Sequence, residues 1–183
     1  MLDACVLYPF HLRNLLVQLG ADRLFRPRWT DEIHAEGIRS LLARAPTLDR
    51  ARLERTRELM RAVLPKADVT GHQALIPSLD LPDAGDRHVL AAALAGGAET
   101  IVTWNLRDFP ASALEPHGVQ AVSPDDFLLS LAGHASGAVR ASTEAARANL
   151  RRAVPSRTEY VEALEAQGMT GFAMWLTQRA AWS

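Results

Sequence analysis

Acidic side chains gather around a short β-branched run in the middle of the chain. The run 101–103 (Ile-Val-Thr) stops before Asn105, and Asp108 follows three residues later. Upstream, Asp83 and Asp86 open an alanine-rich stretch with a helical pattern. Acids that follow a strand and acids that open the preceding helix lie at the same edge of an α/β sheet, where such folds place ligand sites. Carboxylates gathered at that edge favour the binding of a hard cation.

Two further acids occur at places from which they could join this group. Asp3 lies within the apolar run at the start of the chain, and Glu36 lies on a predicted helix. Mg²⁺ and Mn²⁺ prefer oxygen ligands in near-octahedral geometry, which carboxylates from several elements can supply. The sequence therefore predicts a site for one or two such ions, with these catalytic and metal-binding candidates: Asp3, Glu36, Asp86 and Asp108. The supporting candidates are Asn105, Asp83, Thr103 and Arg107.

A divalent cation in such a site points to one kind of chemistry. A bound Mg²⁺ or Mn²⁺ polarises a phosphate oxygen and lowers the pKa of an attacking water, and two ions can hold both sides of an in-line displacement. This chemistry needs no nucleophilic side chain, and the sequence offers no cysteine, serine or lysine in a setting that suggests catalysis. Hydrolysis of a phosphodiester bond is therefore the predicted reaction.

The acids also allow structural roles. Asp3 sits inside an apolar run, where an unpaired charge is costly, so a functional role is favoured there. Glu36 lies on a helix whose surface needs charges anyway, and Glu32 shares its face one turn earlier. The pattern therefore does not decide between a functional and a surface role for Glu36. Either Asp83 or Asp86 could interact with the helix dipole as a cap. Only one cap is needed, and Asp86 is the better candidate ligand.

Asn105 and Asp108 could likewise be turn residues. Their position directly after a buried strand favours a site instead. The prediction therefore rests on the conjunction of all these positions, and no single one decides it.

Length and composition fit one globular domain, or one domain with an appendage. The chain has 183 residues, 48% of them hydrophobic, which is enough to bury a core. The formal net charge of −1 provides no general attraction to nucleic acid, so an anionic partner requires a local basic patch. A single cysteine, Cys5, excludes an internal disulfide and a cysteine-based zinc site.

The start of the chain and its apolar runs indicate a cytoplasmic protein. The first residues carry no cationic leader, and the run Leu15-Leu16-Val17 is far too short to span a bilayer. We therefore expect a soluble protein with no membrane partner. The predicted opening strand is only a few residues long, which leaves open a natural start upstream of Met1.

Predicted strands and helices alternate, which indicates an α/β fold with a mostly parallel sheet. Strands are predicted over residues 2–7, 100–103 and 119–122, with a strand fragment after residue 69. Helices are predicted over residues 12–19, from Thr30 towards Pro46, over 49–64 and 86–95, and from Pro124. After the break at 133–137 the pattern is only helical, over residues 138–154, 158–167 and 172–182. The sequence therefore predicts an α/β part over 1–132 and a helical C-terminal extension over 133–183.

Four segments resemble the motifs of a PIN domain and occur in the order expected of that family: residues 2–7, Glu36, residues 86–93 and residues 101–109. The likeness extends to about residue 130, and the last two motifs are its most specific part. The resemblance implies a three-layer α/β/α fold with a central, mostly parallel sheet, and a Mg²⁺- or Mn²⁺-dependent ribonuclease activity. The size resembles that of a VapC-type toxin of a type II toxin–antitoxin system, and the tail resembles the C-terminal extension of one subgroup.

The resemblance also implies roles for the acids. Asp3 would be the metal-binding acid of the first strand, Glu36 the helix acid, and Asp86 the acid that opens the helix before the fourth strand. Asp108 would supply the last acid, with Asn105 beside it. Some relatives have aspartate where Asn105 stands, so the prediction requires Asp108 to face the metal ion. Hydrolysis would then leave a 5′-phosphate and a 3′-hydroxyl.

The implied partners are an RNA substrate, a cognate antitoxin that blocks the acidic groove, and a second copy of the chain in a homodimer. Arg107, Arg87 and the arginines of the predicted helix 49–64 are candidates for contacts with phosphates that flank the scissile bond.

Three other interpretations compete with this one. A catalytically silent PIN protein would act only as a binding module, and a PIN-like nuclease acting on DNA would use similar acids. A response-regulator receiver also gathers acids at strand ends. It requires a lysine late in the sheet, however, and Lys66 is poorly placed for that role.

Overall fold

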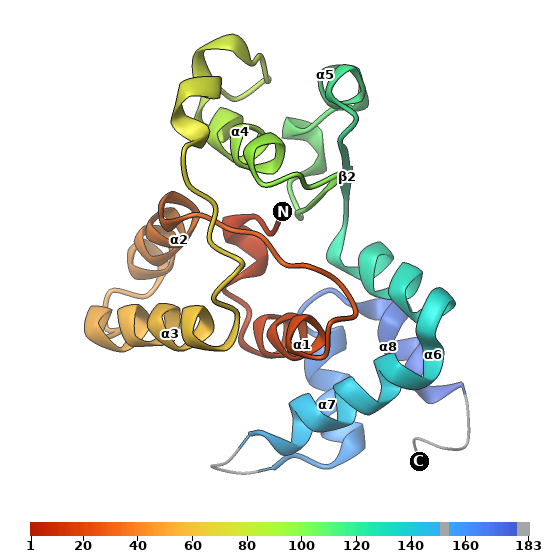
Figure 1. Ribbon diagram of the computed structural model, residues 1–183. Helices are drawn as coiled ribbons and strands as arrows, with labels where there is room; N and C mark the ends of the chain where they lie inside the picture. Colours follow the sequence, from red (N-terminus) through yellow and green to blue (C-terminus); the bar gives the residue numbers. More distant parts are fainter. Residues whose placement is uncertain (151–153, 179–183) are drawn as a thin grey trace. The chain divides into compact units, whose positions relative to one another are not determined.

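The computed structural model describes residues 1–150 and 154–178, which form two compact units (Figure 1). The first unit comprises residues 1–8 and 27–123, and the second comprises residues 9–26 and the described residues from Pro124 onward. A segment near the N-terminus therefore belongs to the same unit as the C-terminal part. All the candidate acids lie in the first unit.

A small parallel sheet lies in the first unit. β1 (Thr100–Val102) pairs in parallel with β2 (Gln120–Val122), with Ile101 opposite Ala121. Ile101 is completely buried. Apolar and β-branched residues of this kind suit a strand that is covered on its faces.

Shorter extended segments continue the sheet on the other side of β1. Leu2 forms a parallel bridge with Val102, and Trp29 forms one with Asp68. Between them, the Leu2 N–H donates a hydrogen bond of 2.8 Å to the Arg28 carbonyl. Every bridge in the described residues is parallel, which confirms the predicted direction. Over the part of the chain that the structure describes, the regular sheet has two strands because the other segments pair at single residues, and the three-layer arrangement stays a prediction.

The predicted opening strand, residues 2–7, is wrong beyond Asp3. The extended backbone ends there, and Ala4–Val6 form a 3₁₀ helix, η1. The Asp3 carboxylate accepts a hydrogen bond of 2.6 Å from the Ala4 N–H and thereby caps this turn. A side chain that bonds to a neighbouring backbone N–H competes with strand pairing, and this competition does not show in the apolar pattern.

Helices α2 (Asp31–Arg44) and α3 (Arg50–Val63) pack on each other in the first unit (Figure 1). α2 begins where the sequence predicts it, because the buried Thr30 hydroxyl accepts a hydrogen bond of 3.1 Å from the N–H three residues later. α3 begins after the Asp49 cap, and Met60 is its buried residue. The other residues of α3 are partly or fully exposed, as expected of a solvated helix.

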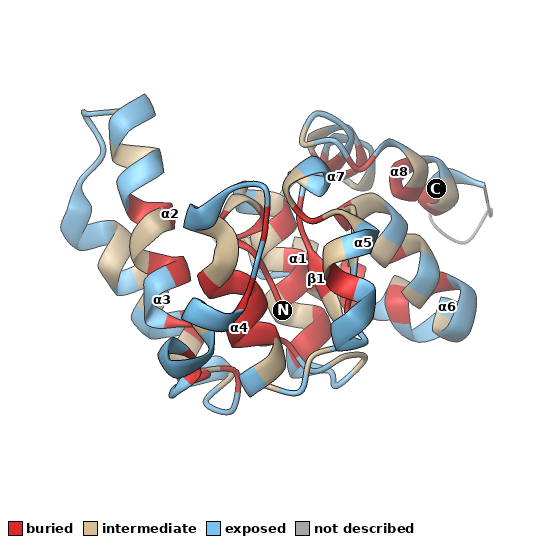
Figure 2. Ribbon diagram, turned by 90° about the horizontal axis from the view of Figure 1, so that it is seen from above, coloured by how far each residue is buried: buried red, intermediate tan, exposed pale blue. Residues whose placement is uncertain are grey.

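The helix that follows Asp86 forms the centre of the core. It is α4 (Arg87–Ala95), and its residues from Val89 to Ala93 are completely buried. In Figure 2 the buried colour runs along α4 and β1 beside the N-terminus. Gly96 ends the helix, as predicted. The remaining elements of the first unit are η2 (His72–Ser78), η3 (Ala84–Asp86), η4 (Leu106–Asp108), α5 (Ala111–Leu114) and η5 (Glu115–His117).

Helices make up the second unit: α1 (Phe10–Ala21), α6 (Pro124–Ala148), α7 (Arg157–Glu165) and α8 (Thr170–Thr177). Both α1 and α8 pack against α6 and α7. The Asp125 carboxylate of α6 accepts hydrogen bonds from the N–H groups of Gly171 and Phe172, so it caps α8 from another helix. Among the described residues, no helix has the length and apolar composition needed to cross a membrane.

The segment 133–137, where the sequence predicts a break, lies inside α6. The backbone of Ala135 leaves helical geometry (φ −143°, ψ 54°), so the helix is kinked there. α6 begins at Pro124, as predicted, and ends at Ala148, short of the predicted end at residue 154. Residues 151–153 of that predicted helix, and 179–182 of the predicted last helix, lie outside the described residues. The predicted domain boundary near residue 133 stays a prediction.

Candidate functional site

A pocket of about 270 Å³ in the first unit collects acids from separate elements. Asp3 ends the extended segment at the N-terminus, Glu36 lies in α2, and Asp86 immediately precedes α4. Asn105 lines the same pocket from the turn after β1. Three of the four predicted metal-binding acids are thus brought together. The remaining lining residues are ones that the sequence does not single out as site residues: Cys5, Arg44 and Trp104.

The Asp3 side chain is almost completely buried, with Asp3 only 6% exposed, and hydrogen bonds hold both of its carboxylate oxygens. Oδ1 accepts from the Ala4 N–H at 2.6 Å, and Oδ2 accepts from the Thr103 hydroxyl at 2.6 Å and from the Cys5 thiol at 3.1 Å. Burial of a charge is costly unless hydrogen bonds compensate it, and hydrogen bonds to a carboxylate are strong. Asp3 is therefore fixed in one orientation at the pocket.

Thr103 connects Asp3 to the turn after β1. Its hydroxyl donates to Asp3 and accepts a hydrogen bond of 3.0 Å from the Asn105 N–H. Thr103 is completely buried at the end of β1, so its hydroxyl has no access to solvent. This predicted supporting residue therefore positions two residues of the pocket.

The two acids that precede α4 have different roles. The Asp83 side chain accepts a hydrogen bond of 2.7 Å from the Gly85 N–H and caps η3. Asp86 makes no capping bond, and its buried Oδ2 atom has no hydrogen-bond partner in the described part of the chain. Asp83 therefore serves the helix start, whereas Asp86 is left to line the pocket.

The pKa of Asp86 reflects the crowding of acids at this place. Burial raises the pKa of its carboxyl, and four neighbouring carboxylates raise it further, to about 6. These neighbours are Asp3, Asp83, Glu36 and Asp108. A carboxylate that is hard to ionise beside other carboxylates is stabilised when a cation binds nearby.

Glu36 faces a histidine that the sequence does not single out. The His88 Nε2 atom lies 3.3 Å from Glu36 Oε2, and the His88 Nδ1 atom lies 2.7 Å from the Gly85 carbonyl oxygen. Burial by itself lowers the pKa of His88, but the contacts with Glu36 and Gly85 outweigh burial and raise this pKa overall. The contact with His88 therefore orients Glu36. Its place two residues after Asp86, in the same motif, is the signal that could have identified it.

The last predicted acid, Asp108, is not among the residues that line the pocket, and Asn105 is. Asp108 lies in η4 with its side chain largely covered, and its Oδ1 atom is 3.8 Å from Arg107 Nε. Its charge still contributes to the raised pKa of Asp86, which indicates that its carboxylate lies near the pocket. That Asp108 faces a metal ion stays a prediction.

Several arginines that the sequence offers as phosphate contacts form ion pairs: Arg57 and Arg61 with Asp31, and Arg87 with Asp80. The Arg107 side chain is 88% exposed and does not line the pocket. The arginine that does line it is Arg44, two helical turns after Glu36 on α2. Helical periodicity counted from Glu36 is the signal that could have identified Arg44.

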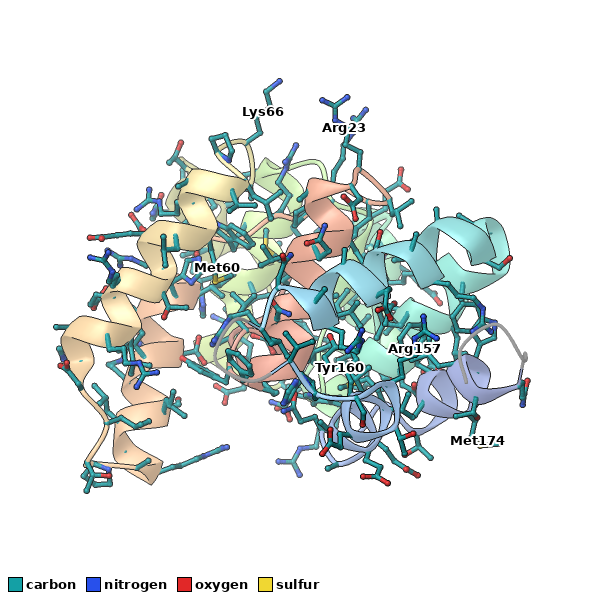
Figure 3. The ribbon with its side chains drawn as sticks, turned by 90° about the horizontal axis from the view of Figure 1, so that it is seen from below. Arg23, Met60, Lys66, Arg157, Tyr160 and Met174 are labelled. Carbon is teal, nitrogen blue, oxygen red and sulfur yellow. The ribbon has the colours of Figure 1, made fainter. Side chains whose placement is uncertain are left out.

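Two reactive residue types can be excluded from the chemistry of the pocket. Burial raises the pKa of the Cys5 thiol to about 12, and the charge of Asp3 adds to this effect, so the thiol stays protonated and is not a nucleophile. Lys66 does not line the pocket, and its side chain extends outward into solvent (Figure 3). A receiver-type site, which needs a lysine beside the acids, is therefore not formed by Lys66.

The lining residues fit a divalent cation. Within residues 1–150 and 154–178, no three acid, histidine or cysteine side chains are already close enough together to hold a metal ion. The buried Asp86 Oδ2 atom, however, has no hydrogen-bond partner in the same part of the chain, and Glu36 Oε2 makes an ion-pair contact of 3.3 Å with His88 without hydrogen-bond geometry. A divalent cation binds oxygen and neutralises repelling carboxylates, so it would satisfy these atoms. Asp3, Glu36 and Asp86 are the residues that would hold it.

Two family models match the chain. A model of the PIN domain matches residues 1–107, and a model of the VapC50 C-terminal domain matches residues 124–178. A protein named "Putative ribonuclease VapC50", from Mycobacterium tuberculosis (strain ATCC 25618 / H37Rv), is 61% identical over 44 residues. This stretch is 24% of the chain and 26% of that relative, so the chain spans about a quarter of the relative's length. No solved structure matches the chain.

Proposed function

Because the chain belongs to the PIN domain family, whose model matches residues 1–107, we propose that it is a metal-dependent endoribonuclease. The observation that carries this proposal is the convergence of Asp3, Glu36 and Asp86, from separate elements, on one pocket. The proposed reaction is hydrolysis of RNA phosphodiester bonds to a 5′-phosphate and a 3′-hydroxyl.

Each acid has its own task in the proposed mechanism. Asp3 is the rigid ligand, because hydrogen bonds hold both of its oxygens. Asp86 contributes an oxygen that has no other partner in the described residues, and Asp108 is proposed as a further ligand. Glu36, oriented by His88, holds the attacking water or a second ion. A bound Mg²⁺ or Mn²⁺ would polarise the scissile phosphate and lower the pKa of the water.

The proposed biological role is that of the toxin in a toxin–antitoxin pair. It is supported by the match of residues 124–178 to the VapC50 C-terminal domain and by the name of the mycobacterial relative. The cognate antitoxin would block the acidic pocket, and a basic residue would suit its charge. A cytoplasmic location and a homodimer are parts of the same proposal.

Cleavage of RNA by the purified full-length chain tests the proposed activity. We expect Mn²⁺ or Mg²⁺ to support cleavage of a structured RNA and excess EDTA to reduce it to background, because the proposed mechanism needs a metal ion to polarise the phosphate and lower the pKa of the water. Labelling of the product ends reports the position of the phosphate. DNA of the same sequence is the comparison substrate. Cleavage of DNA alone would identify a DNA nuclease, and a folded protein inactive on both would be a silent binding module.

Two substitutions of His88 test whether this residue positions Glu36. His88→Asn keeps a donor for the Gly85 carbonyl but does not reach Glu36, whereas His88→Gln places its amide near the Nε2 position. We expect His88→Asn to slow RNA cleavage by about 10- to 100-fold, the usual cost of losing a group that orients a metal ligand. His88→Gln should retain more activity at a similar melting temperature. Equal loss in the two variants would contradict a positioning role.

A further inference from the structure

Arg44 differs from the other charged residues of the pocket in the sign of its charge. It lies at the end of α2, is exposed, and lines the pocket together with Asp3, Glu36 and Asp86. Within the described ranges, its guanidinium forms neither a hydrogen bond nor an ion pair. The Arg44 guanidinium is thus an exposed cation at an acidic pocket that is available to bind a ligand.

Other arginines of the first unit behave differently when acids are near. Arg61 binds both Asp31 and Asp68, at 3.0 and 2.7 Å, and Arg87 binds Asp80 at 2.8 Å. Arg44 lines a pocket of acids without pairing with them. Its guanidinium can therefore bind an anion that enters the pocket, and a phosphate matches its planar, two-pronged donor geometry.

Trp104 provides an aromatic surface at the same pocket. It is 37% exposed, although it is among the largest apolar residues of the chain. Its backbone N–H donates a hydrogen bond of 3.3 Å to Cys5 Sγ, and the next N–H, that of Asn105, donates to the Thr103 hydroxyl. The turn that carries the indole is therefore fixed. An exposed aromatic side chain on a fixed backbone suits stacking with a nucleic-acid base.

We propose that Arg44 and Trp104 form a nucleotide subsite beside the acids, in which Arg44 binds a backbone phosphate and Trp104 stacks on the base of an unpaired nucleotide. The inference rests on the proposed function, because it assigns the substrate of the same site. Bases inside an RNA duplex stack on each other, so their faces are closed to a side chain. The subsite therefore selects single-stranded RNA or an unpaired loop, and Arg44 offsets the repulsion between the acids and the RNA backbone.

Binding of RNA, measured apart from cleavage, tests this subsite. The full chain carrying Asp86→Asn serves as the background, and fluorescence anisotropy follows a labelled unpaired RNA oligomer and the same oligomer annealed to its complement. Arg44→Ala and Trp104→Ala should each weaken binding of the unpaired oligomer by roughly tenfold. Arg44→Lys and Trp104→Phe should retain more binding than the alanine variants. The duplex should bind more weakly than the unpaired oligomer.

Arg39→Ala and Leu106→Ala are matched controls. Arg39 is an exposed arginine of the same helix and Leu106 is 42% exposed two residues after Trp104, and neither lines the pocket. Both control variants should bind within about twofold of the background protein. Equal effects of Arg44→Ala and Arg39→Ala, or of Trp104→Ala and Leu106→Ala, would overturn the subsite, as would equal binding of the duplex.

The same set of proteins separates failure of the subsite from failure of the proposed activity. A wild-type chain that cleaves no RNA overturns the proposed activity, while the anisotropy result still decides whether the subsite binds an unpaired strand. Conversely, metal-dependent cleavage that is unchanged in Arg44→Ala and Trp104→Ala, at limiting RNA concentration, overturns the subsite alone.

Discussion

Asp86→Asn is expected to abolish RNA cleavage, with a loss of about a thousandfold or more, while leaving the fold intact. The substitution removes a carboxylate that would help to hold the metal ion, whose contribution to catalysis is worth several kcal/mol. Asp86 makes no capping bond and its Oδ2 atom has no partner in the described residues, so asparagine removes no hydrogen bond that the fold needs. Cleavage rates over a range of Mn²⁺ concentrations measure the loss.

The same variant should make the metal-free protein more stable at neutral pH. Burial and neighbouring acids raise the pKa of Asp86 from 3.8 to about 6 in the folded state. The contribution of the Asp86 carboxyl to the free energy of unfolding is therefore fully present below its unfolded pKa. It is lost as the pH rises through its pKa in the folded state. Asparagine carries no charge, so it avoids this loss. In EDTA above pH 7 we expect the free energy of unfolding of Asp86→Asn to exceed that of wild type by about 1 kcal/mol, a value reduced for the solvent exposure of the side chain, which raises Tm by a few degrees. The gain should vanish near the unfolded pKa of 3.8.

Asp83→Asn is the matched control for the loss of cleavage. Asparagine caps a helix start as well as aspartate does, so η3 keeps its cap, and Asp83 does not line the pocket. Cleavage by this variant should stay within about threefold of wild type. Equal loss of cleavage in Asp86→Asn and Asp83→Asn, or a melting temperature of Asp86→Asn below that of wild type, would contradict this assignment. Either result would show that Asp86 supports the fold and does not bind the metal ion.

Thr103→Val is expected to lower both stability and cleavage. Valine has nearly the shape of threonine, but it cannot donate to Asp3 or accept from the Asn105 N–H. The loss of a donor to a buried carboxylate costs about 1–3 kcal/mol, which lowers Tm by roughly 3–10 °C in a chain of this size. Cleavage should fall by about 10- to 100-fold because Asp3 is no longer held in place. Thermal melts and cleavage rates of the same preparations provide the two measurements.

Thr103→Ser separates the hydroxyl from the methyl group. Serine keeps the donor and the acceptor and loses only a buried methyl, so most of the cleavage activity should remain while stability falls by about 1 kcal/mol. If serine impaired cleavage as much as valine, the packing of Thr103 rather than its hydrogen bonds would be what the site requires.

Local sequence signals identify much of the first unit and most of its acids. The Thr30 cap predicts the start of α2, and Gly96 predicts the end of α4. Asp86 can be selected because it opens a predicted helix that starts at the sheet edge, whereas the pattern alone leaves Glu36 undecided and the resemblance to the PIN motifs selects it. Each of these signals involves residues that are neighbours in the chain, so they can be recognised without knowledge of the tertiary fold.

The roles of residues within the site depend on contacts that no local pattern contains. Thr103 and Asp3 are 100 positions apart in the chain, yet one hydrogen bond joins them. The pairing of His88 with Glu36 likewise joins two helices. Arg44 is available because, within the described residues, it forms no ion pair, whereas other arginines do. Such distinctions arise from side-chain positions in space, which residue types and spacing do not specify.

The sequence by itself determined the helix over residues 12–19, and it predicted that acids at element ends lie at one edge of a parallel sheet. Only the tertiary structure decided that this helix, α1, packs with the C-terminal helices, that Asp83 rather than Asp86 caps η3, and that Asn105 lines the pocket. The physical reason is that the helical spacing of apolar residues indicates that one face of the helix is buried, but it does not indicate which surface covers that face. Likewise, a short run of acids allows several hydrogen-bonding arrangements, and the surrounding packing selects one of them.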